Sequence, residues 1–458
     1  MVIRSLSVSE TAATPVSYRY WVLAILTVGL ALSFVDRTVL SSIGEAVRVE
    51  FALTNTQFGF LQGPAFVVLY LAMCIPISRL AERYNRVVIV SISVGIWSLF
   101  TTLSGVAGSF VLLCLLRMGV GLGEAGSGPA SQSIISDYFP PHQRARALSI
   151  YYLGMPIGIL AGALFGGFAT QYLSWRWAFV ILGVPGLLLP LVMLATVREP
   201  GRGASDAADV DADHRPGFVE TACYLFGVPA FRHLLMGTIV ASFATYGLSA
   251  FTAPFLIRRF DFDYAQVGLF YGLVTGASYS AGLMLGGYMA PALARRDARW
   301  YGWLPAIGVA LAALCYGLSF QQTRAAAMLP LLFFAGAFHF VYVGPTNGIT
   351  QNLVSPRMRA TTAAILFVSI NIVAITLGPP VTGYLIDHLS ATAYGVAGQA
   401  AYQQACTALT VSAACKKALA EGTSWSLIVI SMFFLWSAAH FLMASRTVEH
   451  DLRRAHRS

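Results

Sequence analysis

Charged residues are scarce in this chain. Asp, Glu, Lys and Arg make up 11% of its 458 residues, less than half of the roughly 25% found in ordinary soluble domains, whereas hydrophobic residues make up 57%. Lysine is almost absent, because Lys416 and Lys417 are the only two. A phosphate-binding loop of the form G-x-x-x-x-G-K-[ST] is therefore excluded. The composition excludes a series of soluble domains and indicates a polytopic membrane protein.

Cysteine is also rare, and its spacing excludes a metal centre of the usual ligand patterns. Four cysteines fall in or beside apolar segments and are interpreted as small packing residues: Cys74, Cys114, Cys223 and Cys315. Cys406 and Cys415 instead share a polar segment that the topology places outside, where a disulfide is permitted. The sequence leaves open whether that disulfide forms. We expect no metal and no cofactor.

Windows of about 20 apolar residues predict twelve membrane-spanning helices in two sets of six. The first set lies near residues 20–44, 55–80, 87–107, 109–136, 147–172 and 177–197. The second set lies near residues 231–257, 265–290, 300–320, 328–353, 361–387 and 424–445. The fold class is therefore an all-α membrane protein with two six-helix halves.

The division of the chain follows from this pattern. We expect an N-terminal half at residues 1–197, a flexible cytoplasmic linker rich in Gly, Ala and Asp at residues 198–228, and a C-terminal half at residues 229–458. An external loop is expected near residues 389–422. The halves align at an offset of about 210 residues, where "SRLAERYNR" corresponds to "GYMAPALAR" and "RARA" to "RMRA". Parallel repeats around a midplane site are an architecture of transporters.

Arginines lie in alternate connections between the predicted helices: Arg79, Arg83, Arg86, Arg144, Arg146, Arg295, Arg296, Arg299, Arg357 and Arg359. Alternate connections share one face of the membrane, and the positive-inside rule makes that face cytoplasmic, together with both termini. The net charge of +9 is thus explained by the membrane topology, and we expect no nucleic-acid partner.

Small residues recur on two of the predicted helices. Glycines 154, 158, 162 and 166 are four residues apart in the fifth predicted helix, and the eighth carries Gly272, Gly276, Ser280, Gly282 and Gly286. Such spacing lets helix backbones approach closely. Ordinary tight packing and a surface on which the two halves rock are both compatible with it.

Charges inside the apolar segments are the main functional signal. Asp36 and Arg37 stand in the first helix, and Arg117 and Glu124 stand two turns apart on one face of the fourth. One ion at a helix centre costs about 2.5–3.5 kcal/mol, so a neutralised cluster of all four costs far less than separate ions. Asp36 and Arg117 are expected at the same depth. A structural ion-pair cluster and a titrating functional site both remain open.

The second half has no acid at the matching positions, which hold Ser249 and Ala337. Proton and anion chemistry is therefore expected in the N-terminal half, with the C-terminal half lining the cavity. His339 is interpreted as a hydrogen-bonded wall residue in preference to a proton carrier.

The whole chain resembles the major facilitator superfamily, through its two halves, "SRLAERYNR", "RMGVGLGEAG" and "REP". Within the superfamily, "FVDRTVLSS", "GLGEAG", "GPTNGITQNLVSPRMRA" and "LGPP" are similar to the spinster-like group, whose animal members carry lysolipids and sphingolipid phosphates. The "DR" and "GEA" motifs are also similar to those of symporters for sugar acids.

The resemblance implies roles for the charged residues. Asp36 and Glu124 are expected to carry protons, and Arg37 and Arg117 to pair with them or to receive an anionic headgroup. Other expected members of the substrate or ion-pair site are His339, Tyr151 and Asn347. Glu82, Arg86 and Asp137 are expected to form a cytoplasmic gate that is paired only when the outer side is open. In the second half, Pro291 replaces the matching acid.

We therefore expect a proton-coupled secondary active transporter that moves an amphipathic or anionic organic solute by alternating access, as a monomer in the cell inner membrane. A sugar-acid proton symporter is the alternative, and a transport-dead membrane sensor a remote one. An enzyme is not expected, because the sequence shows neither metal-ligand pairs nor a nucleophile motif.

Overall fold

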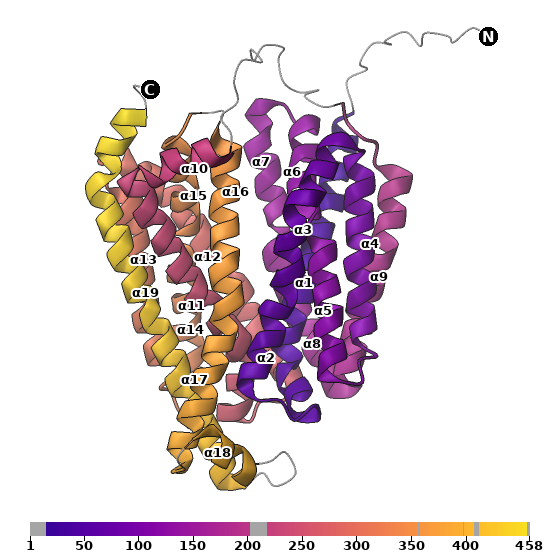
Figure 1. The fold of residues 1–458 in the computed structure, drawn as a ribbon, viewed down its shortest axis with the longest axis vertical. Coiled ribbons are helices and arrows are strands. Elements are labelled where there is room, and N and C mark those ends of the chain that lie inside the picture. Colours follow the sequence, from indigo (N-terminus) through magenta and orange to yellow (C-terminus); the bar gives the residue numbers. More distant parts are fainter. Residues whose placement is uncertain (1–14, 202–217, 356–357, 397, 407–411, 456–458) are drawn as a thin grey trace, which may run out of the picture.

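The computed structural model is helical and contains no strand over the residues that it describes, which are 15–201, 218–355, 358–396, 398–406 and 412–455 (Figure 1). Within these residues, twelve helical segments are long and apolar enough to cross a membrane. The predicted all-α fold with twelve membrane helices is confirmed.

The first six spans form one bundle, and several of them are interrupted. They comprise α1 (Val16–Glu50), α2 (Asn55–Gln62) with α3 (Pro64–Arg83), α4 (Arg86–Ser104), α5 (Phe110–Glu124) with α6 (Ser127–Tyr138), α7 (Pro141–Tyr152) with α8 (Gly154–Tyr172), and α9 (Trp175–Thr196). Gly63, which separates α2 from α3, has a non-helical backbone, and Pro64 begins the next helix. A capping box between Thr54 and Gln57 starts α2.

The second six spans form the other bundle. They comprise α11 (Pro229–Phe260), α12 (Tyr264–Ala294), α13 (Trp300–Ser319), α14 (Ala325–Phe340) with α15 (Val343–Asn352), α16 (Arg359–Ile370) continued by the π-helical segment η2 (Asn371–Ile375) and α17 (Thr376–Tyr394), and α19 (Ala413–Ala455). Two short helices lie outside the spans, α10 (Phe218–Phe226) and α18 (Gln399–Ala405).

Two expectations about the connections need correction. The segment at residues 389–422, which we expected to be a long loop, is largely helical. Helix α17 continues to Tyr394, α19 begins at Ala413 and α18 lies between them. The last part of the expected linker is likewise a helix, α10. Hydropathy windows detect only the apolar part of a helix, which lies in the hydrocarbon layer. They do not show whether the helix continues beyond that layer with polar residues.

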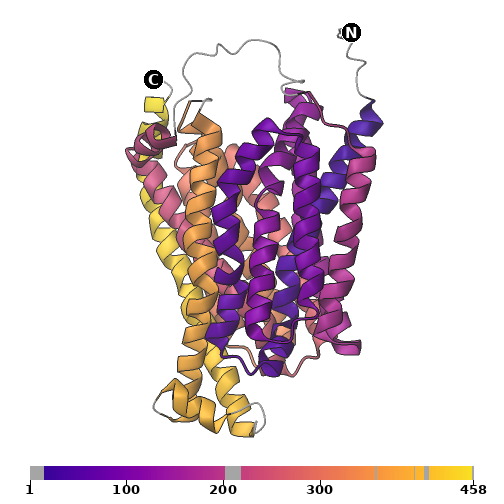
Figure 2. The same cartoon turned by 45° about the vertical axis from the view of Figure 1, so that its right-hand side comes forward.

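The two bundles stand side by side with parallel long axes (Figures 1 and 2). We call the end that carries α10, the start of α1 and the end of α19 the terminus end, and the end that carries α18 the loop end (Figure 1). In Figure 2, α17, α18 and α19 extend beyond the other helices at the loop end.

Backbones of the two halves approach each other closely toward the loop end. A Cβ atom at Gly59 would lie 2.3 Å from the carbonyl oxygen of Pro379, and one at Gly63 would lie 2.2 Å from that of Ile375. Helix α8 likewise meets α12, because a Cβ at Gly167 would lie 2.3 Å from the carbonyl oxygen of Tyr264. Only glycine permits these contacts.

The glycine stripe of α8 does not form this surface between the halves. Added Cβ atoms at Gly154, Gly158 and Gly162 would meet the backbone of α1, within the same half. The four-residue spacing therefore serves helix packing inside the N-terminal bundle. The close approach of α8 to α12 of the other half comes instead from Gly167, one residue after the stripe, and from Gly268 and Gly272 of α12.

Candidate functional site

Asp36 and Arg117 form an ion pair inside the N-terminal bundle. The distance from Arg117 Nη1 to Asp36 Oδ2 is 2.6 Å, and both residues are 2% exposed. Thr101 of α4 donates a hydrogen bond of 2.6 Å to the other carboxylate oxygen, Oδ1. The expectation that Asp36 and Arg117 lie at one depth and in contact is confirmed.

The next residue on α1, Arg37, pairs with Glu124, the acid at the end of α5. Arg37 Nη2 lies 2.5 Å from Glu124 Oε2, and Ser33 donates a 3.0 Å hydrogen bond to the same oxygen. Consecutive residues of a helix point about 100° apart, so Asp36 and Arg37 point in different directions and reach different partners. These partners, Arg117 and Glu124, stand two turns apart on α5. The four charges thus make two ion pairs and sum to zero.

The second pair lies where the two halves face each other. The guanidinium carbon of Arg37 is 4.8 Å from the ring centre of Phe66 on α3, within range of a cation–π contact. Tyr246 of α11, from the C-terminal half, also interacts with Arg37. The Arg37 side chain is 25% exposed whereas that of Glu124 is 2% exposed, so Arg37 is the accessible member of the pair.

Two polar atoms of this cluster have no hydrogen-bond partner in the part of the chain that the structure describes. They are Glu124 Oε1 and Arg117 Nε, both buried. Buried polar atoms are almost always paired, so an exception marks a place for a proton, a water molecule or a ligand atom. Asp36, by contrast, has both oxygens in contact with donors.

The other expected site residues do not contact the four charged side chains, although Tyr151 shares a cavity with Ser33, which bonds to Glu124. His339 is buried in the C-terminal half, where its Nε2 lies 2.6 Å from Thr245 Oγ1, in keeping with a wall residue. Tyr151 lines a small cavity inside the N-terminal half, together with Ser33, Ser131 and Trp97. Asn347 is exposed and donates to the carbonyl oxygen of Val343 within its own helix.

The expected gate residues give a mixed result. Arg86 forms ion pairs with Asp137 and, at 2.6 Å, with Glu199, the acid of the motif "REP", which was not among the expected gate residues. Arg86 and Asp137 lie in the N-terminal half and Glu199 directly follows its last helix, and the three pair while the halves meet near the loop end. The pairing of Arg86 with Asp137 therefore also exists with the loop end closed, and the gate that includes Glu82 stays a prediction. Glu82 belongs to α3, but its side chain lies outside the described part.

The structure contains a second charged cluster, at the loop end, that the sequence did not predict. Glu45 of α1 pairs with Arg258 of α11 at 2.7 Å, and Asp387 of α17 lies close by. An isolated acid in the apolar run "GYLIDHL" was the available signal, but hydropathy gives no partner for it.

Comparison with known proteins decides the class of this fold and site. A family model described as the Major Facilitator Superfamily matches residues 26–379, which is more than half of the chain. The chain belongs to the Major Facilitator Superfamily. Its relatives are transporters, so this superfamily member is a membrane transporter and not an enzyme.

Three similar proteins refine the assignment. An MFS-type efflux pump of Mycolicibacterium smegmatis is 34% identical over 363 residues, which cover 78% of this chain and 82% of that protein. Protein spinster homolog 1 of Xenopus tropicalis is 25% identical over 395 residues, 82% of this chain and 75% of that protein. A solved bacterial homologue of the human lysosomal transporter spinster, inward-facing and unoccupied, has a TM-score of 0.88 at 32% identity and covers 95% of this chain and 99% of that chain. The protein is thus a spinster-like member of the superfamily, as its motifs predicted.

Proposed function

We propose that this transporter couples the movement of an amphipathic or anionic organic solute to protons by alternating access. The observation that carries the proposal is the Glu124 carboxylate. One of its oxygens is bonded to Arg37 and Ser33, and the other is buried without a partner in the described chain. The unpaired oxygen of this carboxylate is an acceptor that can take up a proton. Asp36 is the second candidate proton carrier.

Protonation of Glu124 would change what Arg37 binds. A neutral carboxyl group no longer attracts the guanidinium, so Arg37 is released to bind a carboxylate or phosphate of the solute. Proton binding and anion binding at this site then favour each other, which is a coupling between two ligands. Phe66 and Tyr70, whose rings lie 4.8 and 5.8 Å from the Arg37 guanidinium carbon, supply an apolar wall beside the charge. An anionic head with an apolar tail fits these surroundings.

The proposal includes the orientation of the chain in the membrane, its conformation and its oligomeric state. We place the terminus end in the cytoplasm, since the connections there carry exposed arginines such as Arg79, Arg83, Arg295 and Arg296. The loop end then faces outside, where a disulfide such as Cys406–Cys415 persists. The close contacts between the halves at the loop end, together with the similarity to an inward-facing structure, support an inward-facing conformation. We also propose a monomer in the cell inner membrane, because both halves of the site come from one chain.

The test uses the purified transporter in liposomes with an imposed pH gradient. Lysolipid analogues and small organic acids are first ranked by thermal shift, because a ligand that binds the folded state stabilises it by mass action. The best binder is then followed in transport assays with and without the gradient. Accumulation that needs the gradient supports proton coupling, and accumulation that ignores it contradicts the proposal. Preference for sugar acids over lysolipids would favour the sugar-acid alternative.

A further inference from the structure

The loop-end cluster joins the two halves through buried charges. Glu45, on α1, accepts hydrogen bonds from Arg258 Nε at 3.0 Å and Arg258 Nη2 at 2.7 Å, and from Arg48 Nη2 at 2.6 Å. The Arg258 side chain is 3% exposed and that of Glu45 is 9% exposed. Because Glu45 belongs to the N-terminal half and Arg258 to the C-terminal half, separating the halves here would take Glu45 away from Arg258 and leave it with Arg48 alone.

Asp387 makes a second connection, and it does so by capping a helix of the other half. Its two carboxylate oxygens accept the backbone N–H groups of Asn55 at 3.0 Å and Thr56 at 2.9 Å, the first residues of α2. They also accept the Asn55 side-chain amide at 2.8 Å and the Thr56 hydroxyl at 2.7 Å. A carboxylate at a helix N-terminus satisfies unpaired N–H groups and complements the helix dipole.

Asn55 links the two connections into one network. Its side-chain oxygen accepts a 2.7 Å hydrogen bond from Arg258 Nη2, while its amide nitrogen donates to Asp387. Two acids and two arginines, including Arg48, therefore balance each other within one buried network. Such charge-assisted bonds are roughly twice as strong as neutral ones.

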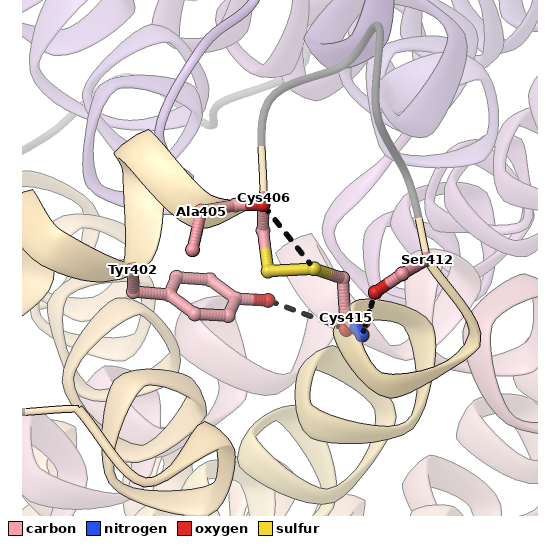
Figure 3. The surroundings of a disulfide bond; sticks show 5 residues. All are labelled: Tyr402, Ala405, Cys406, Ser412 and Cys415. Atoms are coloured by element: carbon pink, nitrogen blue, oxygen red, sulfur yellow. Dashed lines mark hydrogen bonds between the residues drawn. A yellow bond between two sulfur atoms is a disulfide. The ribbon is translucent and has the colours of Figure 1, made fainter.

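The disulfide-bonded helix α18 reaches this network. Gln399, its first residue, donates a 3.1 Å hydrogen bond to Asp387 Oδ2. At its other end, Cys406 is bonded to Cys415 of α19 (Figure 3). The Tyr402 hydroxyl donates to the carbonyl oxygen of Cys415 at 3.4 Å (Figure 3). The Tyr402 ring also contacts that of Tyr394 on α17. The disulfide thus fixes α18 to α19 while Gln399 touches the carboxylate that caps α2.

We propose that Glu45, Arg258 and Asp387 form a latch that holds the loop end closed during transport, and that the disulfide-bonded α18 positions Asp387 in it. The proposal rests on the alternating access proposed above. Reduction of the disulfide would then favour opening of the loop end, so the transporter would respond to the redox state of the compartment that this end faces.

Hydrogen–deuterium exchange of the purified full-length protein, without substrate or pH gradient, tests the latch. In Asp387→Asn the exchange rate of residues 55–62 and 383–394 should rise about 5- to 150-fold, the range expected for coupling of this kind. Residues 141–152 and 359–370, at the terminus end, should not rise. Asp451→Asn is the matched control, because Asp451 caps Ala230 at the start of α11 with a 2.9 Å bond inside one half. An unchanged rate at residues 55–62, or an equal rise at both ends, would overturn the latch.

A double-mutant cycle tests the role of α18. Cys406→Ser with Cys415→Ser, and separately Gln399→Ala, should each raise exchange of residues 55–62 by a smaller factor than Asp387→Asn, because Gln399 supplies one of the five hydrogen bonds to Asp387. Combining the two changes should add nothing further. Faster exchange of residues 399–405 alone, or full additivity, would refute positioning by α18. Since no transport is measured, a failed latch is distinguishable from failed proton coupling.

Discussion

Arg117 Nη1 and Asp36 Oδ2 are 2.6 Å apart, and neither side chain is more than 3% exposed. Beside this closed pair, Arg37 and Glu124 form a second pair whose arginine is partly accessible and whose acid keeps one unpaired oxygen. The two ion pairs therefore differ in what they can bind. The first fixes α1 against α5, and the second has both a free acceptor for a proton and a cation within reach of a solute.

Glu124→Gln is expected to abolish transport driven by a pH gradient while the protein stays folded. Glutamine keeps the size of the side chain and its hydrogen bonds to Arg37 and Ser33, but it cannot take up or release a proton. Uptake into liposomes with an imposed gradient measures the effect, and the control is Glu449→Gln, an exposed acid near the end of α19. Continued accumulation of solute by Glu124→Gln would show that another group carries the proton.

Removing one member of the Asp36–Arg117 pair should cost more stability than removing both. Arg117→Ala or Asp36→Ala leaves a buried charge unpaired, a loss of about 3–5 kcal/mol, whereas the double variant leaves none. The thermal or denaturant midpoints of the three variants, measured in the same detergent, give the comparison. Losses in the double variant that equal the sum of the single losses would mean that the two side chains do not stabilise each other.

Hydropathy predicted the twelve spans, and helix depth predicted that Asp36 meets Arg117. Both quantities depend on position along a helix, which a sequence gives directly. The partner of Arg37 also depends on rotation about the helix axis and on which helices are neighbours. That information arises only when the bundle packs. The sequence therefore predicted the four-residue cluster but not the pairing of Arg37 with Glu124.

The loop end was the least predictable region, for a related reason. Asp387 is separated from Asn55 by more than three hundred positions in the sequence, and its role as a cap for α2 exists only because two halves meet. The end of α17 and the start of α19 also lie beyond the apolar windows, so their length was missed. The sequence did not predict the pairing of Arg86 with Glu199, because Glu199 lies just beyond the last helix of the N-terminal half and comes next to Arg86 only when the bundle packs.

Arg86→Ala is expected to destabilise the N-terminal half, by about 3–5 kcal/mol if the two acids stay charged. Arg86 is 4% exposed and pairs with Asp137 and Glu199, while Glu199 also accepts the backbone N–H of Val87 in the first turn of α4. Arg86→Lys should recover only part of the loss, since an ammonium group cannot reproduce the planar set of donors. Thermal midpoints of both variants, with exposed Arg83→Ala as control, provide the measurement. Equal midpoints for Arg86→Ala and the control would contradict a structural role for these ion pairs.

Two glycine substitutions should have different consequences, because one clash lies inside a half and the other between the halves. In Gly158→Ala the new Cβ would lie 2.2 Å from the carbonyl oxygen of Ala31, and α1 cannot move away without disrupting its own bundle.

In Gly59→Ala the Cβ would lie 2.3 Å from the carbonyl oxygen of Pro379, a clash that the halves relieve by separating at the loop end. We therefore expect Gly158→Ala to lose about 1–3 kcal/mol of stability and Gly59→Ala to lose less, while transport by Gly59→Ala changes because one conformation has become unfavourable. Gly287→Ala is the control, since its Cβ would have no neighbour within 4 Å. Thermal midpoints and initial transport rates of the three variants decide the question. If Gly59→Ala loses as much stability as Gly158→Ala, the contact between α2 and α17 does not separate as a rigid-body interface.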